Sequence, residues 1–223
     1  MTLTRPKNLL PLVRHLSFPT TPVLARAQMT PNLVTAMSLL LGLVAAWSFS
    51  FGNAQGDFTG ALLFLGCYIL DNCDGELARL TDRSSSVGQL FDTTVDWLVH
   101  TAMFVGLGVG SARAWDSDWF LWLGLVGALG TTINSVFALR RDWHAFKAGD
   151  EPVPEQQVEE PPPTSLRDRF IYVFRELSRA DFCFVVMLCA GLNILWLLVA
   201  FGALGAHVYW VTGFMRGAHK FHV

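Results

Sequence analysis

Long apolar stretches alternate with short polar connections along most of the chain. Few charges interrupt the stretches at residues 33–51, 58–70, 88–110 and 119–139. A helix needs about 20 mostly apolar residues to cross the hydrocarbon core of a bilayer. We therefore expect each stretch to form or begin one membrane-spanning helix, the second of which turns polar after residue 70.

The last apolar stretch, residues 182–215, carries no charge over 34 residues. As one helix it would be roughly 50 Å long, against a hydrocarbon core of about 30 Å. We therefore predict two shorter helices joined by a tight turn near Gly202. The total becomes six, and the predicted fold is an all-α integral membrane bundle of six transmembrane helices.

Three further segments do not read as spanning helices. Residues 9–28 mix apolar and basic side chains, which favours an amphipathic helix lying on the membrane interface, with a disordered tail as the alternative. Residues 142–163 are rich in Pro and Glu, a composition typical of a disordered linker. Residues 165–179 place apolar side chains at helical spacing and predict a surface helix.

These patterns divide the chain into four parts. Residues 1–29 form the N-terminal segment with its interfacial helix, and residues 30–140 hold the first four spanning helices. Residues 141–164 form the linker, and residues 165–223 hold the surface helix and the last two spanning helices.

Composition and charge placement add a compartment and an orientation. Hydrophobic residues make up 52% of the chain and charged residues 15%, well below the roughly 25% of soluble domains. With six crossings, 15 of the 16 Lys and Arg residues fall on the side of both termini, and only Arg113 lies opposite. Basic residues mark the cytoplasmic side. We expect a multi-pass protein with both termini in the cytoplasm, in contact with the bilayer and not with nucleic acid.

The chemistry is concentrated in residues 71–96, which read DNCDGELARLTDRSSSVGQLFDTTVD. Asp71 and Asp74 share one face of the second helix, and Asp92 and Asp96 share one face of the third. Antiparallel neighbours joined by a short loop would bring all four carboxylates into one pocket. Acids at membrane depth are costly and usually functional. All-oxygen ligands favour hard cations such as Mg²⁺ or Mn²⁺.

Small and basic residues accompany these acids. Gly75, Ala78 and Gly88 leave room for a bulky ligand against the backbone, and Arg79 is suited to gripping a phosphate. A metal site, a phosphate clamp and a groove together indicate a nucleotide diphosphate as ligand. Because the acids cluster at the predicted cytoplasmic ends, an ion transporter is only a distant alternative.

The same residues resemble the class I CDP-alcohol phosphotransferase signature D-x2-D-G-x2-A-R-x8-G-x3-D-x3-D. Every position is matched, by Asp71, Asp74, Gly75, Ala78, Arg79, Gly88, Asp92 and Asp96. The family's six-helix core, cytoplasmic termini and preceding interfacial helix also resemble the predicted topology. The opening Thr30-Pro31-Asn32, with Thr35, is similar to the corresponding family segment.

The resemblance implies a membrane transferase of phospholipid biosynthesis. Such an enzyme moves a substituted phosphoryl group from a CDP-alcohol to a hydroxyl of a polar acceptor and releases CMP. CDP-diacylglycerol is the expected donor, and a CDP-linked polar headgroup of the inositol-phosphate kind is the alternative. The expected cofactor is Mg²⁺ or Mn²⁺, as two ions, and the active site would face the cytoplasm.

The resemblance also implies roles for single residues. Asp71, Asp74 and Asp92 would bind metal, while Asp96 would act as general base and share the metal site. The expected donor-binding residues are Gly75, Ala78, Arg79, Gly88, Asn32 and Thr35.

Outside the signature the sequence leaves alternatives open. Four arginines at helix ends either bind a phosphorylated acceptor or only anchor the topology; they are Arg140, Arg141, Arg179 and Arg216. We expect Glu76 to be solvent-facing or structural, and His100 and Asn134 to make hydrogen bonds between helices. A homodimer is expected from the family, with loose support from Gly124, Gly127 and Gly130 in the fourth helix.

Overall fold

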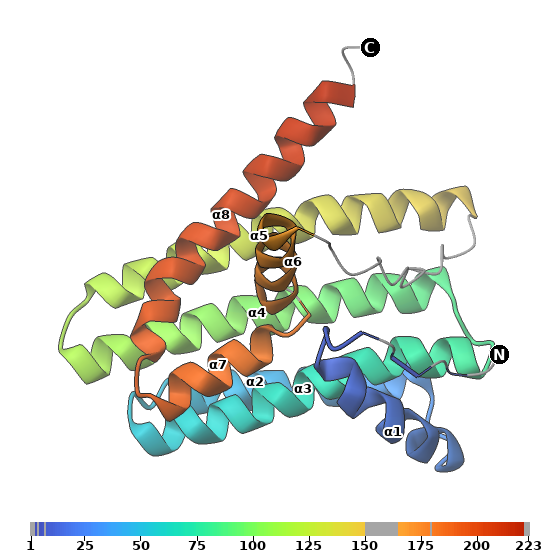
Figure 1. Ribbon diagram of the computed structural model, residues 1–223, viewed down its shortest axis with the longest axis horizontal. Coiled ribbons are helices and arrows are strands. Elements are labelled where there is room, and N and C mark those ends of the chain that lie inside the picture. The colour runs from blue at the N-terminus through green and yellow to red at the C-terminus, as the bar shows by residue number, and fades with distance from the viewer. Residues whose placement is uncertain (1–2, 4, 7, 150–164, 179, 221–223) are drawn as a thin grey trace.

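The structure, a computed structural model, describes residues 3, 5, 6, 8–149, 165–178 and 180–220, and gives only the backbone for 167, 168, 170, 171, 175 and 208–220. Within these residues all regular secondary structure is helical, which confirms the all-α class. The helices are α1 (Val13–Arg26), α2 (Pro31–Phe49), α3 (Ala54–Leu80), α4 (Ser86–Trp115), α5 (Trp119–Ala148), α6 (Leu166–Ser178), α7 (Phe182–Gly191) and α8 (Leu195–Lys220). Helices α2 to α5 run lengthwise beside one another, and α8 crosses them obliquely (Figure 1).

Short polar side chains fix where three of the long helices begin. Thr30, Asn53 and Ser85 lie in extended conformation and accept hydrogen bonds from backbone N–H groups of the first turns of α2, α3 and α4. Such caps satisfy donors that the first helical turn leaves unbonded. The cap at Ser85, seven residues before Asp92, fixes where α4 begins and so determines the helix turn on which Asp92 lies.

Three helices are long and apolar enough to cross a membrane, namely α2, α4 and α5. Helix α3 has 27 residues but becomes polar over its last turns. Helix α7 has 10 residues, about 15 Å, which is half of a hydrocarbon core. These helices fit a multi-pass membrane protein, while the count of six spans stays a prediction.

The tight turn in the last apolar stretch does not lie near Gly202, as the sequence predicted. It lies at residues 192–194, between α7 and α8, where Asn193 has φ 56°. Asparagine tolerates this left-handed conformation better than most residues. Gly202 lies inside α8, where an added Cβ would be 2.9 Å from the ring of Phe104. This glycine therefore serves helix packing.

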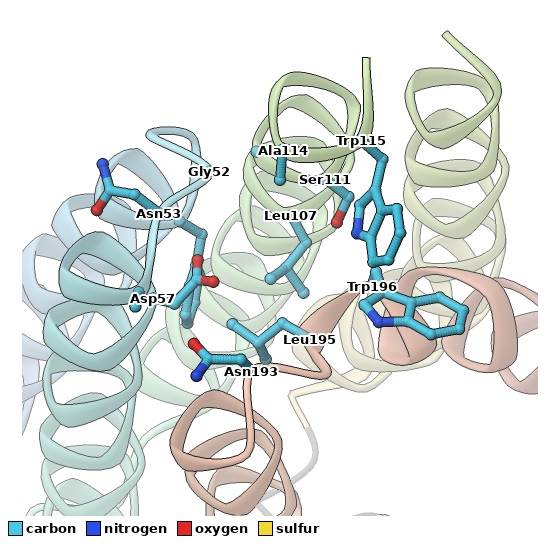
Figure 2. Close-up of a pocket in the computed structure, with 13 residues that line it drawn as sticks. Gly52, Asn53, Asp57, Leu107, Ser111, Ala114, Trp115, Asn193, Leu195 and Trp196 are labelled. Carbon is cyan, nitrogen blue, oxygen red and sulfur yellow. The ribbon is translucent and has the colours of Figure 1, made fainter. Parts of the chain in front are cut away.

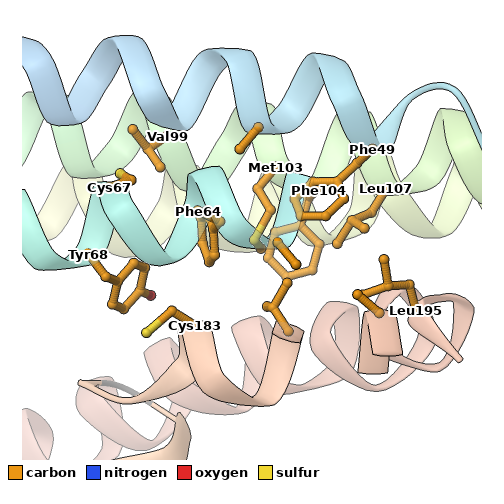
Figure 3. Packing of buried hydrophobic residues seen from close by; sticks show 14 of the residues in the cluster. Phe49, Phe64, Cys67, Tyr68, Val99, Met103, Phe104, Leu107, Cys183 and Leu195 are labelled. Atoms are coloured by element: carbon orange, nitrogen blue, oxygen red, sulfur yellow. The ribbon is translucent and has the colours of Figure 1, made fainter. Parts of the chain in front are cut away.

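Aromatic and branched side chains fill the core between α2, α3, α4 and α7 (Figure 3). Phe64 lies at its centre and contacts the rings of Phe49 and Tyr68 edge-on or tilted. Helices α2 and α4 approach closely, because a Cβ at Gly106 would be 2.1 Å from the carbonyl oxygen of Ala46. Small residues at such contacts are typical of helices packed in membranes.

The glycines of α5 that suggested a dimer pack within the chain. An added Cβ at Gly124 would meet Gly108 of α4 at 2.8 Å, and one at Gly127 would meet the Phe104 ring at 2.4 Å. Gly130 lies against Ala206 of α8. These glycines therefore give no support to a homodimer, which stays a prediction from the family resemblance.

Three predicted segments outside the long helices can be compared with the structure. Residues 13–26 are the helix α1, so the alternative of a disordered tail is wrong. The helix predicted at residues 165–179 is present as α6, and its surface role stays a prediction. The predicted linker begins too early, because α5 continues to Ala148, where Trp143 packs on Phe146 and lies 5.2 Å from the Lys147 ammonium. Residues 150–164 lie outside the described residues.

Candidate functional site

Three of the four predicted acids lie together between α3 and α4. Asp71 and Asp74 come from the last turns of α3, and Asp92 comes from the second turn of α4. Each offers a carboxylate oxygen, and the three oxygens lie within 4.8 Å of one another. Asp74 is buried, with 5% of its surface exposed, and the other two are half-buried.

A divalent cation suits this arrangement. Three carboxylates at this separation repel one another, and Coulomb repulsion grows as the surroundings exclude water. Oxygen atoms of carboxylates are the ligands that Mg²⁺ and Mn²⁺ prefer. The residues present therefore fit a divalent cation, and the structure shows neither the identity of the ion nor the number of ions.

Asp96 differs from the other three acids. It lies one turn beyond Asp92 on α4, is exposed, and is not part of the set of three within the described residues. Along α4 the acids are thus a half-buried Asp92 beside α3 and an exposed Asp96. An exposed carboxylate beside a cluster of ligands has room for a substrate hydroxyl.

Thr35, one of the predicted donor-binding residues, contacts one of the three acids. Its side chain is buried, and its hydroxyl lies 2.5 Å from Oδ2 of Asp74 and 3.1 Å from the carbonyl oxygen of Pro31. The hydroxyl has one proton, and the shorter contact indicates that Asp74 accepts it. Thr35 therefore orients the Asp74 carboxylate from α2, and its contact with a donor nucleotide stays a prediction.

The small residues of the signature lie beside polar side chains. A Cβ at Gly75 would be 3.4 Å from a guanidinium nitrogen of Arg79, so the arginine folds back over this turn of α3. A Cβ at Gly88 would be 3.4 Å from the side-chain oxygen of Asn32. Asn32 at the start of α2 and Gly88 at the start of α4 are therefore neighbours, as a shared nucleotide site requires.

The predicted acceptor arginines are only partly described. Arg140 is exposed, and Arg141 is 73% exposed with its Nε 3.0 Å from Oδ1 of Asp142. Asp142 is buried and accepts a hydrogen bond of 2.7 Å from Thr93, the neighbour of Asp92. This contact fixes the α5 turn that carries both arginines against the α4 turn of Asp92.

The side chains of the remaining two arginines are not among the described residues. Arg179 lies outside the described residues, and Arg216 belongs to the stretch of α8 whose side chains the structure does not describe. Their acceptor-binding role stays a prediction.

His100 and Asn134 make the contacts between helices that the sequence suggested. His100 Nδ1 lies 2.8 Å from the carbonyl oxygen of Asp96, and Nε2 lies 2.9 Å from the hydroxyl of Tyr68. A carbonyl only accepts, so in the neutral ring Nδ1 is protonated and Nε2 accepts from Tyr68. The side-chain amide of Asn134 donates to the carbonyl of Ala206, joining α5 to α8.

The sequence did not reveal how the signature turn is attached to α1. Glu76 is buried, with 4% of its surface exposed, and accepts hydrogen bonds from Ser17 and Thr21. Of the two alternatives for Glu76, the structure supports the structural one. Two hydroxyls four residues apart in the N-terminal segment were the available signal, because they share one helix face.

A cavity of about 240 Å³ opens at the other end of the bundle (Figure 2). It is bounded by the start of α3, the end of α4 and the turn between α7 and α8, with Asp57 and Asn193 as polar lining. Trp115 and Trp196 stand edge to face at its mouth, 5.6 Å between ring centroids. No predicted site residue lines this cavity, so the acids between α3 and α4 remain the candidate site.

The chain matches a known family over this same region. The family profile described as CDP-alcohol phosphatidyltransferase matches residues 28–166, more than half of the chain. The match begins just before α2 and covers every residue of the signature.

Named relatives share about a third of the aligned residues. The chain is 33% identical over 101 residues to archaetidylinositol phosphate synthase of Pyrococcus horikoshii. The aligned residues make up 45% of this chain and 52% of that protein. It is also 32% identical over 100 residues to the bifunctional IPC transferase and DIPP synthase of Aquifex aeolicus. Here the aligned residues make up 45% of this chain and 22% of that protein. The match thus spans about half of the first relative and about a quarter of the second.

A solved structure has a similar fold. It is the crystal structure of Mycobacterium tuberculosis phosphatidylinositol phosphate synthase (PgsA1) with CDP-DAG bound. The TM-score is 0.54 at 22% sequence identity, and the match covers 87% of this chain and 91% of that chain. At this identity the likeness establishes the fold.

Proposed function

The chain belongs to the CDP-alcohol phosphatidyltransferase family, and on that premise we propose that it transfers a substituted phosphoryl group from a CDP-alcohol to a hydroxyl of a polar acceptor. The observation that carries the proposal is the meeting of Asp71, Asp74 and Asp92 across α3 and α4. Carboxylate oxygens at this separation suit Mg²⁺ or Mn²⁺, and the neighbouring Arg79 suits a phosphate, which supports a metal-diphosphate site.

The reaction breaks one phosphorus–oxygen bond and forms another. The acceptor oxygen attacks the phosphorus next to the alcohol, the bond from that phosphorus to the bridging oxygen breaks, and CMP leaves with the bridging oxygen. The proton of the acceptor hydroxyl passes to the Asp96 carboxylate, acting as general base. Its exposure supports this assignment, because the acceptor has to reach it from solvent.

A divalent cation, Mg²⁺ or Mn²⁺ and in the family's manner a pair of ions, would be held by Asp71, Asp74 and Asp92. When bound it would neutralise charge on the diphosphate and the leaving CMP. Thr35 keeps the Asp74 carboxylate in place for this task. Gly75, Ala78, Arg79, Gly88 and Asn32 would surround the CDP group.

For the donor we propose CDP-diacylglycerol, and for the acceptor a phosphorylated inositol. The first relative named above, archaetidylinositol phosphate synthase, and the solved phosphatidylinositol phosphate synthase carry inositol-phosphate products in their names. Arg140 and Arg141 are the proposed acceptor contacts, since their turn packs on the turn of Asp92. A CDP-linked inositol phosphate as donor is the alternative.

The proposed setting is a bilayer with both termini and the acid cluster on the cytoplasmic side, and the proposed assembly is a homodimer. The placement of 15 of the 16 basic residues supports the orientation. The dimer is supported only by family membership. Native mass spectrometry in mild detergent tests it, and a spectrum of monomer alone would count against it.

The test of the function is CMP release by the purified protein in detergent. CDP-diacylglycerol with inositol phosphate should release CMP in Mg²⁺, and EDTA should abolish the reaction until Mg²⁺ or Mn²⁺ is restored. The Asp71→Asn variant should be inactive, whereas Asp82→Asn, in the exposed loop after α3, should match the wild type. Full activity in excess chelator would refute the metal site, and no CMP release from any CDP-alcohol would refute the function.

A further inference from the structure

Glu76 lies inside the signature, yet its carboxylate faces away from the metal-binding acids. It is held by α1, whose Ser17 hydroxyl donates to Oε1 at 2.8 Å and whose Thr21 hydroxyl donates to Oε2 at 2.6 Å. Both hydroxyl residues are fully buried. Each carboxylate oxygen thus has its own donor, and α1 is fixed to α3 at one turn.

Helix geometry places the two carboxylates of this turn on opposite faces. Residues two apart on an α-helix are separated by about 200° around the axis. Asp74 therefore points to α2, where Thr35 donates to it, while Glu76 points to α1. Three hydroxyls on two neighbouring helices hold the signature turn of α3 from both sides.

The turn between these contacts contains a weak point. Gly75 separates Asp74 from Glu76, and a glycine inside a helix costs roughly 0.5–1 kcal/mol relative to alanine. Its lack of a side chain leaves space that the Arg79 guanidinium covers. Glycine makes this turn of α3 easier to bend or twist. Contacts from α1 and α2 therefore have a larger effect on where the turn places its carboxylates.

We propose that Glu76 is a positioning residue, which with Ser17 and Thr21 sets the rotation of α3 so that Asp71 and Asp74 meet Asp92. Side-chain atoms lie about 5–6 Å from a helix axis, so a rotation of 10° moves a carboxylate by about 1 Å. Mg²⁺ holds its ligands at about 2.0–2.1 Å in near-octahedral geometry and tolerates little displacement. The inference rests on the proposed function in so far as these acids bind a divalent cation.

Helix α1 is itself held at its N-terminal end. The Asp181 carboxylate, directly before α7, accepts hydrogen bonds from the backbone N–H groups of Leu12 at 2.6 Å and Val13 at 2.9 Å. The Tyr172 hydroxyl of α6 donates to the carbonyl of Leu10 at 3.1 Å. The position of α1, and through Glu76 the rotation of α3, thus depends on the second half of the chain.

The test measures cation binding directly, with Mn²⁺ alone as the probe, by electron paramagnetic resonance of the purified full-length protein in detergent. The double variant Ser17→Ala with Thr21→Val removes both hydroxyls and keeps the charge of Glu76. We expect its Mn²⁺ Kd to rise about tenfold, the size of effect seen when groups that orient metal ligands are removed. Thr20→Val is the matched control, because among the described residues the Thr20 hydroxyl bonds to Leu16 of its own helix and not to α3; its Kd should be unchanged.

Glu76→Gln separates positioning from general stability. The amide accepts one hydroxyl and can donate to the other, so its Kd should rise less than that of the double variant. A double variant that is folded and binds Mn²⁺ like the wild type overturns the proposal, even if its thermal unfolding midpoint in EDTA falls. If the double variant does not fold, Thr21→Val and Glu76→Gln decide, and wild-type Kd in both overturns it.

The proposed function fails separately from this inference. Wild-type protein that binds Mn²⁺ but releases no CMP from any CDP-alcohol refutes the transferase. The effect of Ser17 and Thr21 on the Mn²⁺ Kd remains measurable in that case.

Discussion

The four acids of the signature differ in exposure, and this difference separates their proposed tasks. Asp74 is buried and bonded to Thr35, while Asp96 is exposed and lies outside the set of three. A buried, oriented carboxylate is suited to hold a cation, and an open one to take a proton from an incoming hydroxyl. The tasks proposed for these two aspartates therefore differ with their exposure, one on α3 and one on α4.

We expect Asp96→Asn to bind CDP-diacylglycerol with near-normal affinity and to lose turnover by about 10²–10⁴-fold, the usual share of a general base. Asparagine keeps the size of the side chain but cannot take the proton. Asp71→Asn should instead weaken donor binding as well. Calorimetry of donor binding beside CMP release distinguishes the two, and near-wild-type turnover in Asp96→Asn would exclude it as the base.

Thr35→Val should raise the Mg²⁺ concentration for half-maximal CMP release by about tenfold, because the Asp74 carboxylate loses its orienting donor. Valine has nearly the shape of threonine, so packing changes little. Thr35→Ser, which keeps the hydroxyl, is the control and should stay close to the wild type. An equal Mg²⁺ requirement in all three proteins would show that the contact does not affect the cation.

At the scale of residues, the acids could be predicted and their supports could not. The spacing of Asp71 and Asp74 on one helix, and of Asp92 on the next, was enough to bring the three together. The partners of Glu76 are 55 and 59 residues away in sequence, and no periodicity connects residues so far apart. Thr35 was predicted as a donor contact, and its hydrogen bond to Asp74 was not predicted.

Among the helices, α1 shows how a short element can be fixed by a single buried side chain. Burial raises the pKa of the Asp181 carboxyl, and the two N–H donors of α1 oppose that rise. Those donors belong to the first turn of α1, which has no partners within its own helix. Asp181 therefore acts as the cap of a helix 168 residues earlier in the chain.

We expect Asp181→Asn to loosen α1 by about 1 kcal/mol, the typical value of a helix cap, and to speed tryptic cleavage at Arg14 about fivefold. The amide can accept from only one of the two N–H groups. Asp118→Asn is the control, since Asp118 starts α5 without a side-chain cap bond. Equal cleavage rates in both variants would show that Asp181 does not hold α1.

The first four apolar stretches begin within four residues of the observed helix starts, whereas the turn between α7 and α8 was predicted at the wrong place. Thr30, Asn53 and Ser85 are typical cap residues before apolar stretches, and all three cap helices. In residues 182–215 the sequence offers several glycines, and the structure uses Asn193 for the turn and Gly202 for contact with Phe104. Glycine serves both purposes, so sequence alone did not decide between them.

For the whole molecule, the orientation in the membrane is the prediction that most needs a test. All four native cysteines are buried, so single introduced cysteines report cleanly. In intact cells an impermeant maleimide should label Asp118→Cys, in the exposed turn before α5, and should spare Ser84→Cys, in the loop before α4, until the membrane is opened. The reverse pattern would invert the orientation, and labelling of both sites on the same side would break the helix count.

The bond between Asp181 and the start of α1 also has a consequence for biosynthesis. A ribosome adds about 5–20 residues each second, so the residue that caps α1 emerges roughly 10–30 s after the helix that it caps. During that interval Ser17 and Thr21 can already engage Glu76, whereas the first turn of α1 has to wait. A nascent chain stalled before Asp181 would therefore carry its complete signature beside an uncapped N-terminal helix, a difference that membrane quality control could recognise.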